Sequence, residues 1–473
     1  MKKYAVVLLG AALVLNTVAC SGGGGGDREE QTTNPRHEGV DEAVSKLLGS
    51  EALPDVKVTK KIKLLGWENV EKWIDETAPA GSLFKQKYGI PEEDKGENII
   101  EYANCGIYAA RYEELAKRVT SDDAPDIFPF EARYYPYGVY VNLFQTIDGV
   151  IDLTSPEWAD SLEAISRFEW GGKNYCAVTE LLPSYFLWYR KSILESAGLD
   201  DPYALYKAGQ WDWDKFLEMC VSFSDIPNNK YSLSGWDPDE SLICTSGVGL
   251  ITLENGKLVN NMFDTRVERA MDLVYTIASR DYRYPHNILN DWEMNHNEWR
   301  SGNILFWDNG QWWYADMLYK FRDKEGWADD EINLVPYPRD PYSDKYYQQM
   351  RHEAFMLCSG SKNVEGFKAL TQCLVLTSRE AEVKQQARDK LKRDYGWTDK
   401  QLDILDETVR DLSPVFDFKN GIGEDIGGKD LYEKPVEYVT KYVLVHANSY
   451  TQVRQEYAAE IDNRVKELNA SVG

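Results

Sequence analysis

Five aromatic side chains lie within nine residues of the segment RSGNILFWDNGQWWYADM, residues 300–317. Trp307 and Trp312 flank a polar Asp-Asn-Gly-Gln turn, which a core strand or helix would not normally contain. Flat rings can pack against the C–H face of a sugar, and planar polar side chains can bind its hydroxyl groups. A buried hydroxyl without its hydrogen bond costs ~1–3 kcal/mol, so such a turn could also select between sugars. Packing in the core is the alternative for Trp307 and Trp313.

The N-terminus has the pattern of an export signal. Lys2 and Lys3 precede an apolar run over 4–18, which is shorter than the ~20 residues that a membrane span needs. Ala19-Cys20 and a flexible, glycine-rich stretch follow. This junction resembles a bacterial lipobox, although Thr17 stands where Leu is usual. The resemblance implies that Cys20 is lipidated and anchors the mature chain in the membrane. A simple secreted protein is the alternative.

Composition limits the partners of the chain. The formal net charge of −25 becomes −27 once the signal peptide and its two lysines are removed. A field of this sign argues against nucleic acid and anionic ligands and favours neutral or cationic partners. About 420 residues follow the linker, more than one ordinary core, so we expect two lobes. The six cysteines after Cys20 are expected to be buried thiols, although they permit fifteen disulfide connectivities.

Alternating strand and helix patterns predict an α/β fold. A strand over 62–65, a helix over 107–119 and a strand over 124–128 predict a βαβ unit. Apolar stripes predict further helices over 267–278 and 453–468, and the charged stretch 384–407 predicts a helical pair that is an insertion or a solvated surface element. Ligands of α/β sheets bind beyond the carboxyl ends of strands. Trp67-Glu68 and Phe130–Arg133 follow two strands and are therefore candidate binding residues.

Six motifs occur in order between Ser121 and Leu370: SDDAPDIFPF, GGKNYCAVTE with LWYRKSILESAGL, AGQWDWDKFLEMC, SGNILFWDNGQWW, INLVPYPRD and SGSKNVEGFKAL. Together, behind a lipoprotein signal, they resemble the family 1 extracellular solute-binding proteins, the receptor lipoproteins of ABC importers that are related to maltose-binding proteins. The resemblance covers about residues 60–376. The sequence departs from it at Tyr189–Lys191, where the family favours Tyr-Asn-Lys, and in its aromatic richness.

The resemblance implies a fold with two α/β lobes, the periplasmic-binding-protein fold, in which discontinuous lobes are joined by crossing strands at a hinge. The implied crossings lie near residues 185–189, 353–357 and 414–419. The expected division is a signal peptide at 1–19, a lipid-anchored linker at 20–55, an N-terminal lobe of 56–184 plus 357–418, and a C-terminal lobe of 185–356 plus 419–473.

The resemblance also implies ligand-binding residues. Maltose-binding relatives present the Trp of an Asn-Gly-x-Trp motif to the sugar, and Asn309-Gly310-Gln311-Trp312 matches that motif. The other candidates are Trp307, Phe130, Glu131, Arg133, Trp67, Glu68, Glu180, Tyr185, Trp236, Asp237, Arg351 and His352. Glu180 is the nearest match to a sugar-contacting carboxylate, at an offset of two residues. A surface or structural role is an equal alternative for Trp67-Glu68, Trp236-Asp237 and Arg351-His352. The WDWD stretch over 211–214 is expected to cap a helix through Asp212 or Asp214.

A secreted carbohydrate-active enzyme is the competing class. A glycosidase needs two carboxylates, and 78 acidic residues make some such pair unavoidable, so their number decides nothing. The Gly-x-Ser-x-Gly and His-Glu-x-x-His motifs are absent, and the stretch after Asp237 lacks the glycine of a calcium loop. A surface sensor or adhesin on the same fold is a third interpretation.

We therefore expect a monomeric, non-enzymatic cell-surface receptor that needs no cofactor or metal. It would bind a mono- or oligosaccharide, or another neutral solute, in the cleft between its lobes. It would deliver this solute to the membrane permease subunits of an ABC importer. Nucleic acid is not an expected partner.

Overall fold

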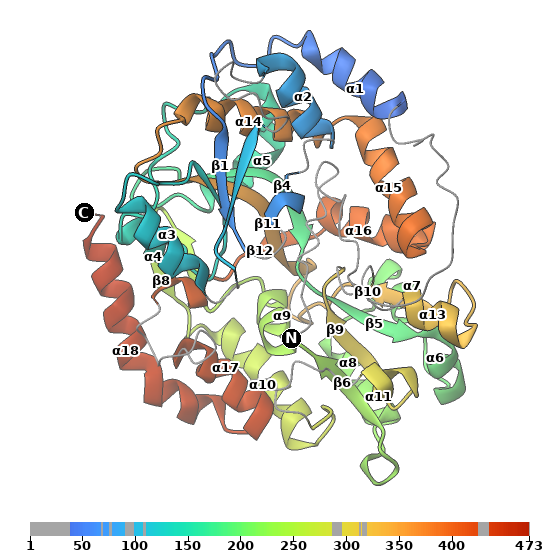
Figure 1. The fold of residues 1–473 in the computed structure, drawn as a ribbon. Helices are drawn as coiled ribbons and strands as arrows, with labels where there is room; N and C mark the ends of the chain where they lie inside the picture. Colours follow the sequence, from blue (N-terminus) through green and yellow to red (C-terminus); the bar gives the residue numbers. More distant parts are fainter. Residues whose placement is uncertain are drawn as a thin grey trace.

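The computed structural model describes residues 38–67, 70–74, 78–89, 99–106, 110–285, 296–311, 314, 319–423 and 435–472. Two large β-sheets, each flanked by helices, form the two lobes (Figure 1). Among the described helices, none combines the length and the apolar character that a membrane span requires.

The first sheet has six strands, in the order β12-β11-β3-β1-β2, with β4 paired to β11. β1 is parallel to β2 and β3, whereas β11 is antiparallel to β3 and β4. The strands are β1 (Ile62–Gly66), β2 (Ile100–Asn104), β3 (Ile127–Pro129), β4 (Cys176–Pro183), β11 (Tyr347–Leu357) and β12 (Ser413–Val415). The accompanying helices are α1 (Glu38–Leu48), η1 (Val70–Lys72), α2 (Pro79–Tyr88), α3 (Arg111–Val119), α4 (Tyr137–Tyr140), η3 (Pro156–Trp158), α5 (Ala159–Ser166) and α14 (Val364–Thr377).

The second sheet has four strands, in the order β10-β5-β9-β6, and a separate hairpin is formed by β7 and β8. The strands are β5 (Phe186–Arg190), β6 (Tyr231–Gly235), β7 (Ile251–Glu254), β8 (Lys257–Asn260), β9 (Ile304–Asn309) and β10 (Ile332–Val335). The accompanying helices are α6 (Lys191–Ala197), α7 (Pro202–Lys207), α8 (Trp213–Phe223), η4 (Ile226–Asn228), α9 (Pro238–Thr245), α10 (Thr265–Ser279), α11 (His296–Arg300), α13 (Tyr319–Glu325), η6 (Lys419–Gly421), α17 (Pro435–His446) and α18 (Tyr450–Ala470).

Most of the elements predicted from apolar patterns are present. β1, α3 and β3 correspond to the predicted strand, helix and strand, and α10 and α18 to the two predicted apolar helices. The prediction missed β2, which lies between β1 and β3 in the chain and pairs with β1. In β2 only Ile100 and Ala103 are buried, so its apolar pattern is too short to distinguish a strand from a loop. The predicted cap is confirmed, since Asp212 accepts a hydrogen bond from Lys215 N at 3.0 Å.

The charged stretch forms the predicted pair of helices, α15 (Ala381–Tyr395) and α16 (Asp399–Asp411). The pair is not merely a solvated surface element, because each helix buries one apolar face. Leu391 of α15 and Ile404 of α16 belong to the same buried cluster as Trp188 and Tyr314 of the second lobe. The apolar stripe on each helix is narrow, and the many charged residues on the exposed faces make it difficult to detect in the sequence.

Three segments connect the lobes. The first crossing lies between the end of β4 at Pro183 and the start of β5 at Phe186, beside the predicted position. β11 already pairs with β4 from Met350 onward, so the chain has re-entered the first sheet before the crossing predicted at 353–357. β12 pairs with the first residues of β11 and leads into η6, close to the third predicted crossing. The exact domain boundaries remain a prediction.

The described cysteines carry free thiols, as expected. Cys105 is half-buried, and the others, Cys176, Cys220, Cys244, Cys358 and Cys373, are buried. Burial raises the pKa of each of these thiols, to about 11 for Cys105.

Candidate functional site

The loop after β3, at the carboxyl edge of the first sheet, carries Glu131. Its carboxylate accepts hydrogen bonds from Arg111 Nε, at 2.5 Å, and from Tyr112 OH. The side chain of Arg111 is fully buried, and its guanidinium lies over the rings of Trp67 and Tyr112. The charge of Glu131 is thus balanced inside the lobe, and this contact fixes the loop after β3.

Trp67 and Phe130 lie at the same edge and are both less than one-tenth exposed. The Trp67 ring packs against Trp73, with ring centroids 4.2 Å apart. The Phe130 ring packs against Tyr135 and Phe168, each with centroids 5.3 Å away. These contacts account for both aromatic residues as parts of the lobe core, and a direct role in ligand binding remains a prediction.

In the second lobe, Asp237 follows β6 and lies against the end of β9. Its backbone N donates to Asp308 Oδ2 at 2.7 Å. Gly235 permits this close approach, because its φ is +131° and a Cβ there would lie 2.1 Å from the carbonyl oxygen of Asp308. Tyr337 OH donates to Asp308 Oδ1 at 2.5 Å. Burial raises the pKa of Asp308 to about 8, although the hydrogen bonds from Tyr337 and Asp237 oppose the shift.

Lys441 of α17 holds the carboxylates at the start of α9. Its Nζ lies 2.6 Å from Asp237 Oδ1 and 2.8 Å from Asp239 Oδ1, and all three residues are buried. Burial disfavours the ionised form of Asp237, but Lys441 and Arg133 outweigh it and lower the pKa. Burial alone would lower the pKa of Lys441, yet Asp237 and Asp239 raise it. Asp237 and Lys441 therefore stabilise each other's ionised forms.

A second buried ion pair ties α9 to the hinge. Lys419 Nζ of η6 lies 2.5 Å from Glu240 Oε1, and both side chains are less than one-tenth exposed. Gln349 Nε2 of β11 donates to Glu240 Oε2 at 3.3 Å. In Figure 1, α9 accordingly lies in the centre of the molecule, between the two sheets. Two of the crossing segments thus contact one helix of the second lobe.

Groups from both lobes and from the hinge meet at Asp237. Tyr185, in the first crossing, donates its hydroxyl to Asp237 Oδ2 at 3.0 Å. Gln348 of β11 donates to the carbonyl oxygen of Tyr185 at 2.7 Å. Arg133, from the loop after β3 in the first lobe, lies close enough to lower the pKa of Asp237. Burial raises the pKa of Tyr185, and Arg133 opposes that shift. The predicted residues Arg133, Tyr185 and Asp237 are therefore brought together.

A further charged group lies on the ladder between β4 and β11. Glu353 of β11 pairs directly with Glu180 of β4, and Arg351 pairs with Leu182. Arg351 and Glu353 are two residues apart on one strand and share a face of the sheet. Burial raises the pKa of Glu353 to about 7, with Arg351 opposing the shift. Burial lowers the pKa of Arg351, with Glu353 and Tyr185 opposing. Arg351 thus interacts electrostatically both with Glu353 and with Tyr185.

The aromatic turn is only partly described. Trp307 of β9 is fully buried, and its ring packs edge-on against Trp299 with centroids 6.4 Å apart. This position corresponds to the alternative of core packing. Trp236 is half-buried and packs against the same apolar cluster. Trp312, Glu68 and the side chain of His352 lie outside the described residues, so their roles remain predictions.

Sequence reasoning missed Asp308, Lys419, Lys441 and Glu353. Asp308 stands inside the aromatic turn, where the aromatic residues are the stronger sequence signal and nothing indicates a buried acid. Lys441 lies 204 positions after Asp237 in the chain, and no spacing connects them. Glu353 falls within a predicted crossing, which assigns it no role of its own. A charged residue within an apolar strand, as at Arg351 and Glu353, was the one signal available.

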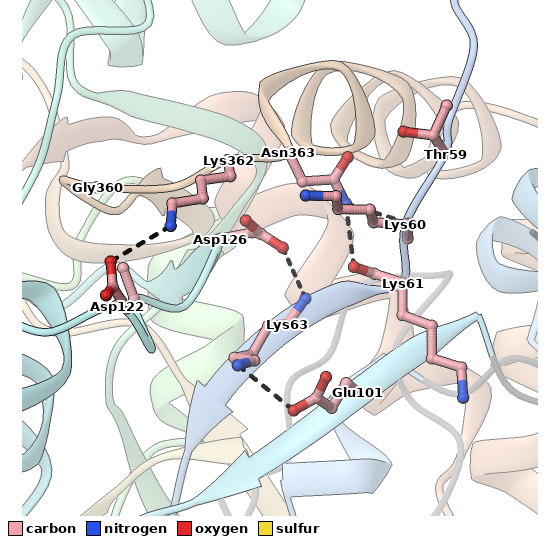
Figure 2. A pocket seen from close by; sticks show the side chains of 11 residues that line it. Thr59, Lys60, Lys61, Lys63, Glu101, Asp122, Asp126, Gly360, Lys362 and Asn363 are labelled. Atoms are coloured by element: carbon pink, nitrogen blue, oxygen red, sulfur yellow. Dashed lines mark hydrogen bonds and ion pairs between the residues drawn. The ribbon is translucent and has the colours of Figure 1, made fainter. Parts of the chain in front are cut away.

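One cavity of about 430 Å³ opens at the amino ends of β1, β2 and β3, away from this group of residues (Figure 2). Lys63 Nζ lies 3.5 Å from Glu101 and Lys362 Nζ 3.5 Å from Asp122. Asn363 donates to the carbonyl oxygen of Lys61 at 3.1 Å. Carboxylates therefore pair with two of its lysines, and the cavity lies at the wrong end of the strands for a ligand of an α/β sheet. Among the residues that the structure describes, no cluster of three His, Cys, Asp or Glu side chains could hold a metal ion.

Residues 100–386 match the model of a family described as bacterial extracellular solute-binding protein. The chain belongs to this family. Membership places this solute-binding protein outside the cytoplasm. No curated protein sequence matches it significantly.

Solved structures resemble this solute-binding protein over nearly its whole length. The sugar-binding protein MalE from Xanthomonas citri matches 87% of this chain and 98% of its own at a TM-score of 0.59 and 14% identity. The GacH receptor of Streptomyces glaucescens matches 88% and 99% at a TM-score of 0.57 and 15% identity. An extracellular solute-binding protein from Staphylococcus aureus in complex with maltose matches 86% and 98% at 0.57 and 11%. At such identities the likeness shows the fold, and the predicted two-lobed periplasmic-binding-protein fold is confirmed.

Proposed function

We propose that this solute-binding protein binds a mono- or oligosaccharide in a cleft between its lobes and delivers it to the permease subunits of an ABC importer. The convergence of Arg133, Tyr185 and Asp237 carries the proposal. Arg133 can donate hydrogen bonds to a sugar, and the Tyr185 hydroxyl oxygen and the carboxylate of Asp237 can accept them from its hydroxyl groups. Such a set, drawn from both lobes and the hinge, suits a polyhydroxylated ligand and couples its binding to lobe closure.

The ligands of structural relatives support this assignment. Complexes with maltose and with maltotetraose are known for two proteins of the same fold. In the proposed cycle the ligand stabilises the closed arrangement of the lobes, and the permease recognises that arrangement. The sugar is released unchanged, so the protein acts as a receptor and not as an enzyme. The lobes divide near the boundaries expected from the sequence, and the receptor acts as a monomer.

The same proposal includes a lipid anchor at Cys20. A lipidated cysteine followed by a flexible linker would hold the lobes next to the permease. Cys20→Ser should release the protein from the membrane fraction of cells that express it. Retention of this variant in the membrane pellet, at the level of the parent, would contradict the anchor without affecting the assignment of the ligand.

Sugar binding is tested by thermal shift against maltose, maltotetraose, D-glucose and D-tagatose, followed by calorimetry with the tightest binder. A ligand at 100 times its Kd should add ~2.7 kcal/mol to the free energy of unfolding. Arg133→Gln should weaken binding about tenfold or more, because a hydrogen bond to a charged group contributes ~1.5–3 kcal/mol. Arg410→Gln is the matched control, since Arg410 is exposed on α16 and pairs only with Asp411 among the described residues.

Two results would overturn the proposal. One is the absence of any thermal shift with these sugars at millimolar concentration. The other is steady cleavage of an oligosaccharide, followed by chromatography, that a single carboxylate substitution abolishes. The second result would favour a carbohydrate-active enzyme on this fold.

A further inference from the structure

The carboxylate of Glu353 is buried without a full set of hydrogen-bond partners. The residue is only 3% exposed, and Oε1 accepts no hydrogen bond within the described part of the chain. Buried polar atoms in proteins are nearly always satisfied, and one left unsatisfied destabilises the folded state, more so when it is charged. The fold therefore holds an acceptor in the hinge strand that the protein itself does not use.

The neighbours of Glu353 increase this cost. Glu180 stands directly opposite it across the β4–β11 ladder, and like charges in that position destabilise a sheet. Arg351, two residues earlier on the same strand, is the one cation that acts on Glu353 within the described chain. Burial also disfavours the charged form of Arg351, which weakens the one cation that acts on Glu353. Oε1 of Glu353 thus has room for a hydrogen-bond donor.

Glu353 lies next to the loop that carries a proposed ligand-binding residue. Its neighbour Ala354 accepts a hydrogen bond from Phe130 N at 2.9 Å, so it flanks the loop that carries Glu131 and Arg133. Arg351 is electrically coupled to Tyr185, whose hydroxyl donates to Asp237. Glu353 therefore stands on the first-lobe side of the group that the proposed sugar would contact.

A purely structural role does not explain this residue. An apolar side chain of similar size would be expected to be at least as stable here. The unpartnered oxygen disfavours the empty protein and is useful only when something else supplies a donor.

We propose that Glu353 is a specificity-determining residue, which accepts a hydrogen bond through Oε1 from a hydroxyl or ammonium group of the ligand. The inference rests on the proposed sugar-binding function. Both donors have the same chemistry at this oxygen, but an ammonium group would also neutralise the negative charge of Glu353. A ligand that lacks a donor at this position would leave the carboxylate buried and unpaired, and would be rejected.

The test uses the wild-type protein with Glu353→Gln and Glu353→Leu. The amide of Gln keeps the shape and a weaker acceptor, whereas Leu removes the acceptor. The probes are D-glucose, D-glucosamine and maltose, with affinities measured by calorimetry. We expect affinity for the tightest probe to fall in the order wild type, Gln, Leu, with a loss of at least about tenfold for Leu. A preference for glucosamine over glucose that Glu353→Gln removes would identify the donor as ammonium, and equal affinities would identify it as hydroxyl.

The melting temperatures of the empty proteins separate this role from a structural one. Ligand contact predicts that Glu353→Gln melts at or above the wild-type temperature, whereas a structural ion pair predicts a clear decrease. Glu460→Gln, on the exposed face of α18, controls for the loss of one negative charge. Unchanged affinity in Glu353→Leu, or a large loss of stability in Glu353→Gln, would overturn this inference and leave the proposed function standing. Failure of every probe to bind the wild type would overturn both.

Discussion

Asp308 and Glu353 are both buried acids, but their surroundings differ. Burial raises the pKa of Asp308 to about 8 and of Glu353 to about 7. Asp308, in the second lobe, accepts one hydrogen bond at each oxygen, from Tyr337 and from the backbone of Asp237. Glu353, in the hinge strand, has one oxygen that accepts none within the described chain. Hydrogen bonds thus compensate for the desolvation of Asp308 in the second lobe, whereas the hydrogen bonds to Glu353 at the hinge are incomplete.

This difference separates structure from function more clearly than burial does. A satisfied acid such as Asp308 positions the loop that carries Asp237, and its loss should affect folding first. An acid with an unused acceptor contributes little to folding, and its loss should affect binding first. This distinction would be wrong if loss of Asp308 mainly weakened binding, or if loss of Glu353 mainly lowered stability.

The largest expected effect comes from removing the cation that the second-lobe carboxylates share. Lys441→Met leaves Asp237 and Asp239 buried without their counter-charge, which costs ~3–5 kcal/mol for a broken buried pair. We expect a marked decrease in the melting temperature and in the free energy of unfolding measured with urea. Lys466→Met, on the exposed face of α18, should leave both unchanged. Equal stability of the two variants would mean that the carboxylates find other partners.

A smaller effect, on binding rather than folding, is expected at the aromatic turn. Trp312→Ala should weaken sugar binding by ~2 kcal/mol or more, about thirtyfold, if its ring stacks on the ligand. Trp307→Ala offers the contrast, because Trp307 is fully buried and its removal should lower the melting temperature of the empty protein. Calorimetric affinity and melting temperature are measured for both variants. A normal affinity and a lowered melting temperature for Trp312→Ala would place that ring in the core.

The sequence allowed the fold to be predicted because the apolar repeats of β1, α10 and α18 and the order of the motifs are local signals. It also indicated Arg133, which follows a strand, and, through the family resemblance, Tyr185 and Asp237; their role in binding remains a prediction. It did not indicate Lys441 or Asp308, since their importance arises from contacts between segments far apart in the chain. The same applies to Glu353, whose unused oxygen is visible only once its neighbours are known. Local patterns predict elements, whereas charge balance is a property of the assembled core.

The dependence of stability on pH should distinguish the two acids. For an acid with a raised pKa, the folded protein keeps a proton that the unfolded chain has lost, so the stabilisation is complete below pH ~4 and is lost as pH rises through the folded pKa. This window ends near pH 8 for Asp308 and near pH 7 for Glu353. Each contributes a slope of up to ~1.4 kcal/mol per pH unit.

Urea unfolding at several pH values between 4 and 9 measures this slope. Asp308→Asn should flatten the decline up to about pH 8, whereas Glu353→Gln should flatten it only up to about pH 7. Saturating sugar should change the slope of wild-type stability against pH near pH 7 and leave the slope of Glu353→Gln unaltered. Identical profiles for the two variants and the wild type would show that neither acid holds a proton in the folded protein over this range.

The smallest effect, ~1 kcal/mol, is expected from Tyr337→Phe, which removes one neutral hydrogen bond and little volume. The change takes away the donor to Asp308 Oδ1 and leaves Asp308 with one donor, as the second-lobe equivalent of Glu353. Because the hydrogen bond from Tyr337 opposes the raised pKa of Asp308, its loss should raise that pKa further and extend the decline in stability to higher pH. Sugar affinity should stay close to that of the wild type, since Tyr337 is fully buried and the backbone of Asp237 keeps its own hydrogen bond to Asp308. Tyr185→Phe is the matched variant, because its hydroxyl donates to Asp237 at the proposed site and its loss should weaken binding. If Tyr337→Phe weakened binding as much as Tyr185→Phe does, Asp308 would belong to the binding site, and the contrast with Glu353 would fail.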